Sequence, residues 1–238
     1  MPADPRIRRL RSRLLRWGRQ HFQAYPWRAF TDPYAIIVAE FMLHRTQVRQ
    51  VLPVYKAFMT LYPSLEVFAR HNPRASERLL EPLGLRWRIE GMLAALQQLW
   101  RKHRAVPANF DALLAIQGIG QYIAGATICF SQNTPVALID TNTVRVIGRV
   151  FGLDLRGEAR RKPAVVAAVG RACDPHQPRN FYYALIDLAH DICRPAEPHC
   201  DSCPLLDVPC AFGRAYVVVA PRKTGAGDSS APGESDIR

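Results

Sequence analysis

Two acidic side chains occupy sequence positions that suit acid-base chemistry. Glu40 lies inside the apolar run 34–43, and a glutamate is rarely buried there without a partner. It either lies on a polar stripe or faces a cavity, where burial would raise its pKa and suit it to act as a general acid. Asp140 follows an apolar segment and opens a predicted helix, which it can cap. A carboxylate held there could also stabilise positive charge on a sugar while a glycosidic bond breaks.

A glycine pair forms a second feature. Gly118-Ile119-Gly120 stands between two helical patterns. The glycines permit a tight turn whose free N–H groups open the following helix, and such a helix start binds a phosphate without reading any base. An ordinary helix-helix turn, with glycine used for its backbone freedom, explains the same residues. The pair alone does not decide between these two interpretations.

Four of the six cysteines form a third feature, with the spacing Cys193-x6-Cys200-x2-Cys203-x6-Cys210. A disulfide framework suits a secreted chain, and nothing here indicates secretion. Zinc remains a rival, although zinc ribbons usually have two separated C-x2-C pairs and this run has one. Closely grouped thiolates also suit a [4Fe-4S] cluster. The other two, Cys129 and Cys173, fall in helical contexts and are expected to be small buried apolar residues.

The composition bounds the classes of partner. The 238 residues carry 32 Lys plus Arg against 20 Asp plus Glu, a formal charge of +12 to which only four lysines contribute. Such an excess favours a polyanion, nucleic acid before a membrane surface, although arginines on solvated helix faces would give the same count. No apolar run reaches the roughly 18 residues of a membrane span, and arginines fill the place of a signal-peptide core. We expect a soluble cytoplasmic protein without membrane contact, associated with the nucleoid through DNA.

Hydrophobic periodicity predicts an all-α chain. Helices are expected over 7–22, 33–43, 48–61, 76–80, 88–103 and 110–116, with Asp32 capping the second. The main candidate strand is the short run 217–219. From residue 222 to 238 the Gly- and Ser-rich composition predicts a disordered tail.

The glycine pair, followed twenty residues later by Ile139-Asp140, resembles the helix-hairpin-helix DNA glycosylases, the superfamily of endonuclease III and the adenine mismatch glycosylases. The similarity covers about 26–210, and one departure is Gln117, where the family usually has proline. It implies a two-lobed all-α fold with a [4Fe-4S] cluster loop. A six-helix lobe with the hairpin would span 29–135, and a cluster lobe would combine 1–28 with 136–213. It also implies a monomer that binds duplex DNA containing a mismatch.

The resemblance assigns roles to individual residues. Residues of the hairpin, Gly118, Ile119, Gly120 and Gln121, would grip a phosphate while a base is flipped into a pocket between the lobes. Asp140 matches the catalytic aspartate that serves the sugar, and Glu40 matches the glutamate that protonates adenine in the adenine enzymes. Arg45 would fill the space left by the flipped base. Leu85 would wedge into the opposite strand.

Tyr122 decides the expected reaction and substrate. Bifunctional members carry a lysine two residues after the second glycine, which forms a Schiff base and leads to strand cutting. Here that residue is Tyr122, and no lysine lies between Lys102 and Lys162. We therefore predict a monofunctional enzyme of base-excision repair, with Tyr122 lining the pocket. Tyrosine at this position is characteristic of the thymine-guanine mismatch glycosylases.

The chain also ends soon after its cysteines, without the further domain of the adenine enzymes. Both features favour removal of thymine or uracil opposite guanine. The alternatives are an adenine glycosylase acting on A:G or A:8-oxoguanine, and a protein that binds lesions without catalysis.

The cysteine spacing resembles the glycosylase signature C-x6-C-x2-C-x5-C, with one extra residue before Cys210. It implies a [4Fe-4S] cluster with a structural role, which pins a loop against DNA. The ligands would be Cys193, Cys200, Cys203 and Cys210. The interval after Cys193 is usually basic in the family, and here it includes Glu197, which weakens the expected phosphate contacts.

Overall fold

A computed structural model describes residues 4–84 and 86–219, and all regular elements within these ranges are helices. The predicted all-α class is therefore confirmed for the described chain. The candidate strand at 217–219 is wrong, because these residues end helix α12 (Ala211–Val219). Three β-branched residues at the end of a helix have only a weak preference for a strand, and α12 as a whole packs against α9. The predicted tail, 222–238, lies outside the described residues.

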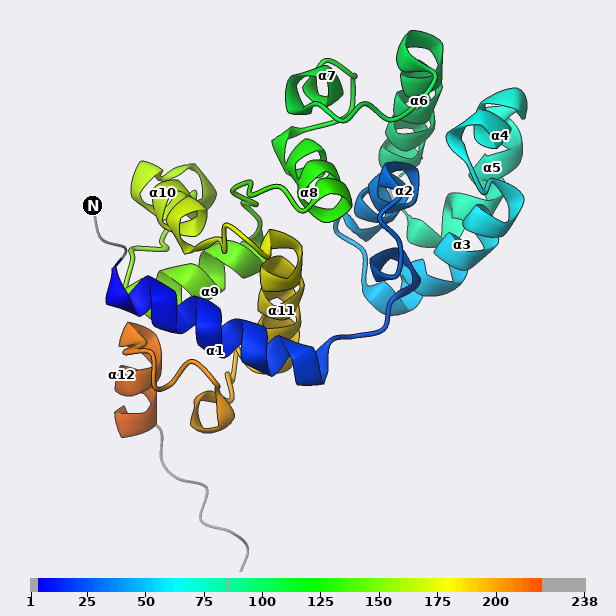
Figure 1. Cartoon of the computed structure of the whole chain (residues 1–238). Helices are drawn as coiled ribbons and strands as arrows, with labels where there is room; N and C mark the ends of the chain where they lie inside the picture. The colour runs from blue at the N-terminus through cyan, green and yellow to red at the C-terminus, as the bar shows by residue number, and fades with distance from the viewer. Residues whose placement is uncertain (1–3, 85, 220–238) are drawn as a thin grey trace, which may run out of the picture.

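Seven helices gather on one side of the molecule (Figure 1). They are α2 (Pro33–Leu43), α3 (Val48–Leu61), α4 (Leu65–Arg70), α5 (Pro73–Leu80), α6 (Arg86–His103), α7 (Phe110–Leu114) and α8 (Gln121–Gln132). Their apolar faces enclose one core that includes Phe58, Phe68 and Leu96, all with no exposed surface. Burial of such side chains supplies the main favourable term for this half of the fold.

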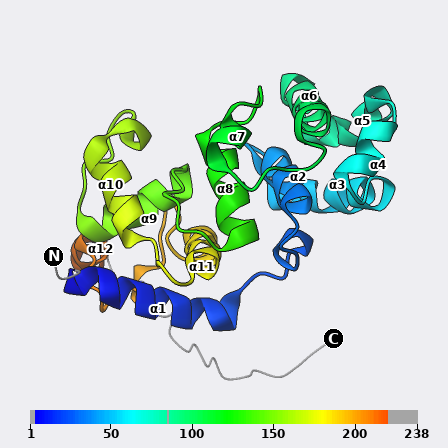
Figure 2. The same ribbon diagram turned by 45° about the horizontal axis from the view of Figure 1, so that its top comes forward.

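The remaining helices pack on the other side, around a second core. They are α1 (Pro5–His21), α9 (Thr141–Phe151), α10 (Pro163–Ala172), α11 (Pro178–Asp191) and α12. The N-terminal helix α1 packs across α11, so the first and last described helices, α1 and α12, belong to the same half (Figures 1 and 2). Leu10 and Leu14 of α1 meet Phe181 and Leu185 of α11 in this core. The exact division of the two lobes at residues 28/29 and 135/136 stays a prediction.

A buried ion pair ties the two halves together. Arg28, in the 3₁₀ helix η1 (Pro26–Arg28), donates two hydrogen bonds to Asp187 of α11, at 2.7 and 2.8 Å. The guanidinium also lies over the rings of Tyr25 and Tyr183. Asp187 is 1% exposed. A carboxylate that deeply buried is stable only when it is paired, so Arg28 is needed for the halves to meet as they do.

Helix α2 explains why Glu40 is buried. Asp32 caps this helix by accepting a hydrogen bond from the Tyr34 N–H at 3.1 Å, and Pro33 occupies the first turn, as predicted. Every residue from 34 to 42 is buried, so α2 has no solvent face. A helix that is apolar all round belongs in the interior. Its one carboxylate is therefore carried into the protein.

None of the helices in the described ranges is long and apolar enough to cross a membrane.

Candidate active site

Glu40, Tyr122 and Asp140 come together where the two halves meet. Glu40 projects from α2 and is 8% exposed, and the side chain of Tyr122, on the first turn of α8, lies close enough to act on the pKa of its carboxyl group. Tyr122 packs against both cores. Asp140 is the N-cap of α9 and is close enough for its negative charge to act on the other two groups. The structure thus brings all three predicted catalytic residues into one site.

The surroundings tune the protonation of this site. Desolvation by burial, with the negative charge of Asp140 adding to it, raises the pKa of Glu40 to about 7. The hydrogen bond from Tyr122 and the positive charge of Arg28 act in the opposite direction. Burial, followed by the charges of Glu40 and Asp140, raises the pKa of the Tyr122 phenol well above its usual value. Near neutral pH, Tyr122 is therefore a neutral donor and Glu40 can give or accept a proton.

Asp140 is held by its own helix. Its Oδ1 accepts the Thr143 N–H at 2.7 Å, while the Thr143 hydroxyl accepts the Asp140 N–H at 3.0 Å, which completes a capping box. The Oδ2 accepts a longer bond, 3.3 Å, from the Asn142 amide. The predicted N-cap is confirmed. One oxygen fixes the carboxylate in place, and the other is less committed and can face a reacting group.

The glycine pair forms a turn between α7 and α8. Gly118 has a φ of +91°, and a Cβ there would lie 3.3 Å from the Gly91 carbonyl oxygen of α6, so both backbone conformation and space require glycine. Gly120 is the N-cap of α8 and makes no side-chain capping bond. Gly118, Gly120 and Gln121 are exposed, whereas the Ile119 side chain is buried. The free N–H groups at this exposed helix start can therefore donate hydrogen bonds to a phosphate oxygen.

Of the two residues predicted to enter the DNA duplex, Arg45 and Leu85, the structure describes Arg45. Arg45 lies in the loop between α2 and α3, is exposed, and has a φ of +61°. Leu85 lies outside the described residues. The residue before it, Gly84, ends the 3₁₀ helix η2 (Glu81–Leu83) with a φ of +68°.

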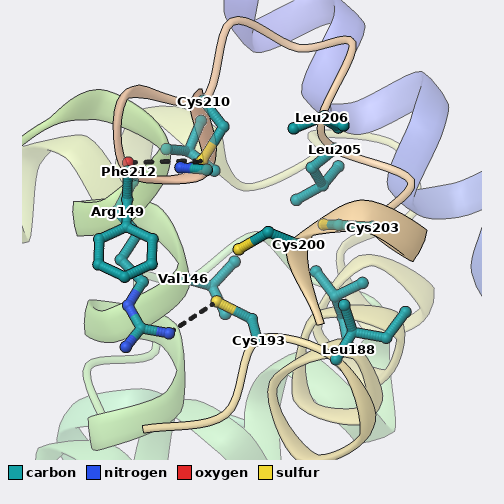
Figure 3. A pocket seen from close by; sticks show the side chains of 13 residues that line it. Val146, Arg149, Leu188, Cys193, Cys200, Cys203, Leu205, Leu206, Cys210 and Phe212 are labelled. Atoms are coloured by element: carbon teal, nitrogen blue, oxygen red, sulfur yellow. Dashed lines mark hydrogen bonds between the residues drawn. The ribbon is translucent and has the colours of Figure 1, made fainter. Parts of the chain in front are cut away.

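The four clustered cysteines line one cavity, together with Val146 and Phe212 (Figure 3). Two nitrogen donors reach their sulfurs: the Arg149 guanidinium lies 3.4 Å from Cys193 Sγ, and the Gly213 N–H lies 3.3 Å from Cys210 Sγ. Thiolate ligands of an iron-sulfur cluster accept such bonds. By contrast, Cys129 and Cys173 are buried among apolar residues, as predicted.

The thiols do not converge on a single point. No group of three or more His, Cys, Asp or Glu within 4–84 and 86–219 is placed to hold one metal ion. A zinc site needs all four sulfurs at about 2.3 Å from one ion, whereas each ligand of a [4Fe-4S] cluster binds a different iron and the sulfurs stand farther apart. All four thiols line the same cavity, so their residue types fit a cluster with four thiolate ligands.

Two arginines of α9 hold the start of the cysteine loop. Arg145 Nε donates to the Cys193 carbonyl at 2.8 Å, and its Nη2 donates to Asn142 Oδ1 at 3.0 Å. Arg149 donates to the Arg194 and Pro195 carbonyls, at 2.6 and 2.9 Å. One helix therefore carries Asp140 at its start and anchors the cysteine loop along its length.

Sequence reasoning did not find Arg145, Arg149 or the Arg28–Asp187 pair as parts of the site. The i, i+4 spacing of Arg145 and Arg149 places both on one face of a helix and was the available signal. It does not reveal what that face contacts. No local pattern announces the Arg28–Asp187 pair, because its partners are separated by 159 residues.

The described lysines are engaged elsewhere. Lys102 donates to the Ala115 carbonyl at 3.5 Å, Lys162 pairs with Asp154 at 2.7 Å, and Lys56 is exposed on α3. Lys223 lies outside the described residues. The hydrogen bonds and ion pairs of the three described lysines do not include Glu40, Tyr122 or Asp140.

Comparison with known proteins identifies the family. No family model matches the chain. The chain is 32% identical over 209 residues to a thymine-DNA glycosylase of Aeropyrum pernix, covering 85% of this chain and 94% of that protein. It is 30% identical to a thymine/uracil-DNA glycosylase of Pyrobaculum aerophilum, covering 89% and 95%.

An adenine DNA glycosylase of Mycolicibacterium smegmatis is 32% identical, covering 81% of this chain and 66% of that protein. Among solved structures, a thermostable thymine-DNA glycosylase superposes with a TM-score of 0.79 at 25% identity, covering 88% of this chain and 97% of the other. The resemblance inferred from the glycine pair and Asp140 is thereby confirmed. The chain belongs to the helix-hairpin-helix DNA glycosylases, enzymes that break the N-glycosidic bond between a base and its sugar.

Proposed function

We propose that the protein is a monofunctional glycosylase that removes thymine or uracil opposite guanine in duplex DNA. The observation that carries this proposal is the placement of Tyr122 against Glu40 and beside Asp140, where the two halves meet. Tyr122 stands where bifunctional relatives have a lysine, and the structure keeps it as a neutral hydrogen-bonding group. The names of the two archaeal relatives support the choice of base.

Each group of the site has its own role in the proposed reaction. The start of α8 holds a backbone phosphate, and the extruded base enters the site beside Tyr122. Glu40 assists the departing base or positions the attacking water, since its pKa near 7 permits proton transfer at neutral pH. Asp140 stabilises the positive charge that develops on the sugar. Arg45 fills the gap left in the stack, and Leu85, outside the described residues, wedges into the opposite strand.

No strand cutting is expected. A Schiff base requires an uncharged lysine amine within reach of the sugar. Of the four lysines, two are bonded elsewhere and one is exposed on the outer helix α3. Water is therefore the nucleophile, and the product is an intact strand with an abasic site.

We also propose that the cysteine cavity holds a [4Fe-4S] cluster. Cys193, Cys200, Cys203 and Cys210 would be its ligands, and Arg149 and the Gly213 N–H would donate to two of the sulfurs. When bound, the cluster supplies a rigid cross-link of the loop from 193 to 210. Arg145 and Arg149 then attach that loop to the helix that Asp140 caps.

One panel of labelled duplexes tests the function. Purified protein is incubated with G:T, G:U, G:A and 8-oxoguanine:A pairs, and strands are resolved with and without alkali. We expect excision from G:T or G:U, visible only after alkali, and no covalent complex with borohydride. Excision of adenine alone would favour the alternative function, an adenine glycosylase. Strand cutting without alkali would overturn the monofunctional assignment, and binding without any release of base would contradict catalysis on these substrates.

A further inference from the structure

Arg88 is a buried cation without an acidic partner. It lies in the first turn of α6 and is 4% exposed. Among the ion pairs of residues 4–84 and 86–219, none involves Arg88. Instead, its Nη1 donates to the His44 carbonyl and to Thr46 Oγ1, the latter at 2.7 Å. Its Nη2 donates to the Leu83 carbonyl at 2.8 Å and to the Gly84 carbonyl at 3.5 Å.

These acceptors belong to two loops that are about forty residues apart in sequence. The first, residues 44–46, joins α2 to α3, and the second, residues 83–84, precedes α6. We call them the paired loops. Each contains a residue with a left-handed backbone, Arg45 at a φ of +61° and Gly84 at +68°. The Thr46 hydroxyl adds a direct bond between them, 3.4 Å to the Leu83 carbonyl.

The guanidinium is shaped for this task. Its two Nη atoms point in different directions from one rigid plane, so each can serve a different loop. Burying a cation is strongly unfavourable unless its donors are satisfied, and an apolar side chain of similar size would stabilise the core at least as well. The left-handed backbone at Arg45 is a further cost, because its Cβ crowds the following carbonyl oxygen in that conformation. Unfavourable local features of this kind, a buried cation and a strained backbone, are typical of a functional site that the surrounding structure holds in place.

We propose that Arg88 is a positioning residue that locks the paired loops together so that Arg45 is held ready to enter the duplex when a base is flipped out. This inference rests on the proposed function, because Arg45 acts only if a base leaves the stack. The bond from Arg88 to the His44 carbonyl acts on the residue directly before Arg45. Arg88 itself is too buried to contact DNA, so its effect must pass through the loop that carries Arg45.

A double-mutant cycle on Arg45 and Arg88 tests the proposal. Arg88→Lys keeps the charge but offers one nitrogen in place of the fork. We expect Arg88→Lys and Arg45→Ala each to slow single-turnover excision from a G:U duplex by about tenfold or more. In the Arg45→Ala background, Arg88→Lys should slow it by less than about threefold, since both changes remove the same contribution. Arg101→Lys, at the exposed far end of the same helix, is the matched control and should leave the rate unchanged.

The other outcomes are decisive. Multiplicative effects of about a hundredfold would show that Arg88 acts independently of Arg45 and would overturn the inference, as would a wild-type rate in Arg88→Lys. If Arg88→Lys does not fold, Thr46→Ala takes its place in the same cycle, because it removes two bonds that join the paired loops, the one from Arg88 and the one to the Leu83 carbonyl. A wild-type protein that releases no base from any duplex would refute the proposed function rather than the clamp.

Discussion

The buried carboxyl of Glu40 makes the stability of the protein depend on pH in a predictable direction. Its pKa is about 7 in the folded protein, against 4.5 as its ordinary value. The folded state therefore binds a proton that the unfolded chain has already lost across this interval. The stability associated with the protonated carboxyl is fully present below about pH 4.5 and is lost as the pH rises through about 7.

The magnitude follows from that difference. At about 1.4 kcal/mol for each pKa unit, the shift corresponds to about 3 kcal/mol of unfolding free energy lost between pH 4.5 and pH 8. Glu40→Gln keeps the shape of the side chain and cannot ionise. The free energy of unfolding of the variant, relative to the wild type, should therefore rise by about 3 kcal/mol over the same interval.

Urea unfolding followed by circular dichroism at pH 5, 6, 7, 8 and 9 measures this difference. Glu81→Gln, at an exposed position, is the matched control and should follow the wild-type curve. A Glu40→Gln curve parallel to the wild type across this range would refute the reasoning, because it would mean that Glu40 titrates alike in the folded and unfolded chains. Single-turnover excision supplies a second readout. If Glu40 must be protonated to assist the departing base, the wild-type rate falls above about pH 7 and the variant lacks that fall.

Three further predictions address the rest of the site. Asp140→Asn should slow excision by about a hundredfold or more while DNA binding persists. The free energy of unfolding should change by less than about 1 kcal/mol, because an asparagine oxygen still caps α9. A near-normal rate would exclude Asp140 as the catalytic carboxylate. Arg28→Ala strands the buried Asp187 and should cost about 3 to 5 kcal/mol in urea unfolding, whereas Arg28→Met combined with Asp187→Leu should recover most of that loss. Cys200→Ala should abolish bound iron and the visible absorbance at about 400 nm in anaerobically purified protein; stoichiometric zinc in the wild type would contradict the cluster.

Local signals in the sequence predicted local structure well. The range 48–61 matches α3 (Val48–Leu61) because Pro63 and an apolar face mark its end. Asp32 and Asp140 were expected to cap helices, and both do so. In each case the deciding contact is made within three residues along the chain, where residue type and spacing determine the outcome.

Contacts between distant segments escaped that reasoning. Glu40 was recognised as unusual, but its partner Tyr122 stands 82 positions later, and only the packing of α2 against α8 joins them. Arg88 lies in a predicted helix and resembles any other arginine of this chain. Arg88 is buried because the 44–46 loop packs over it, and hydrophobic periodicity in the sequence does not predict the position of a loop. The strand expected at 217–219 was wrong because these residues continue helix α12, which begins at Ala211, so the short β-branched run did not decide its own structure.

Part of the arginine excess serves the structure of the protein, because several arginines bind backbone carbonyls within it. On the N-terminal helix α1, Arg6 donates to the Val150 and Pro209 carbonyls, at 2.7 and 3.0 Å, and Arg11 donates to the Arg171 and Ala172 carbonyls. Arg88 and Arg149 also span carbonyls of two residues or loops. A forked guanidinium can bind acceptors on two sides from separate nitrogens, whereas a lysine presents only one nitrogen to both acceptors. Arginines bound in this way are not free to neutralise phosphates, so the salt dependence of DNA binding should reflect fewer contacts than the charge of +12 suggests.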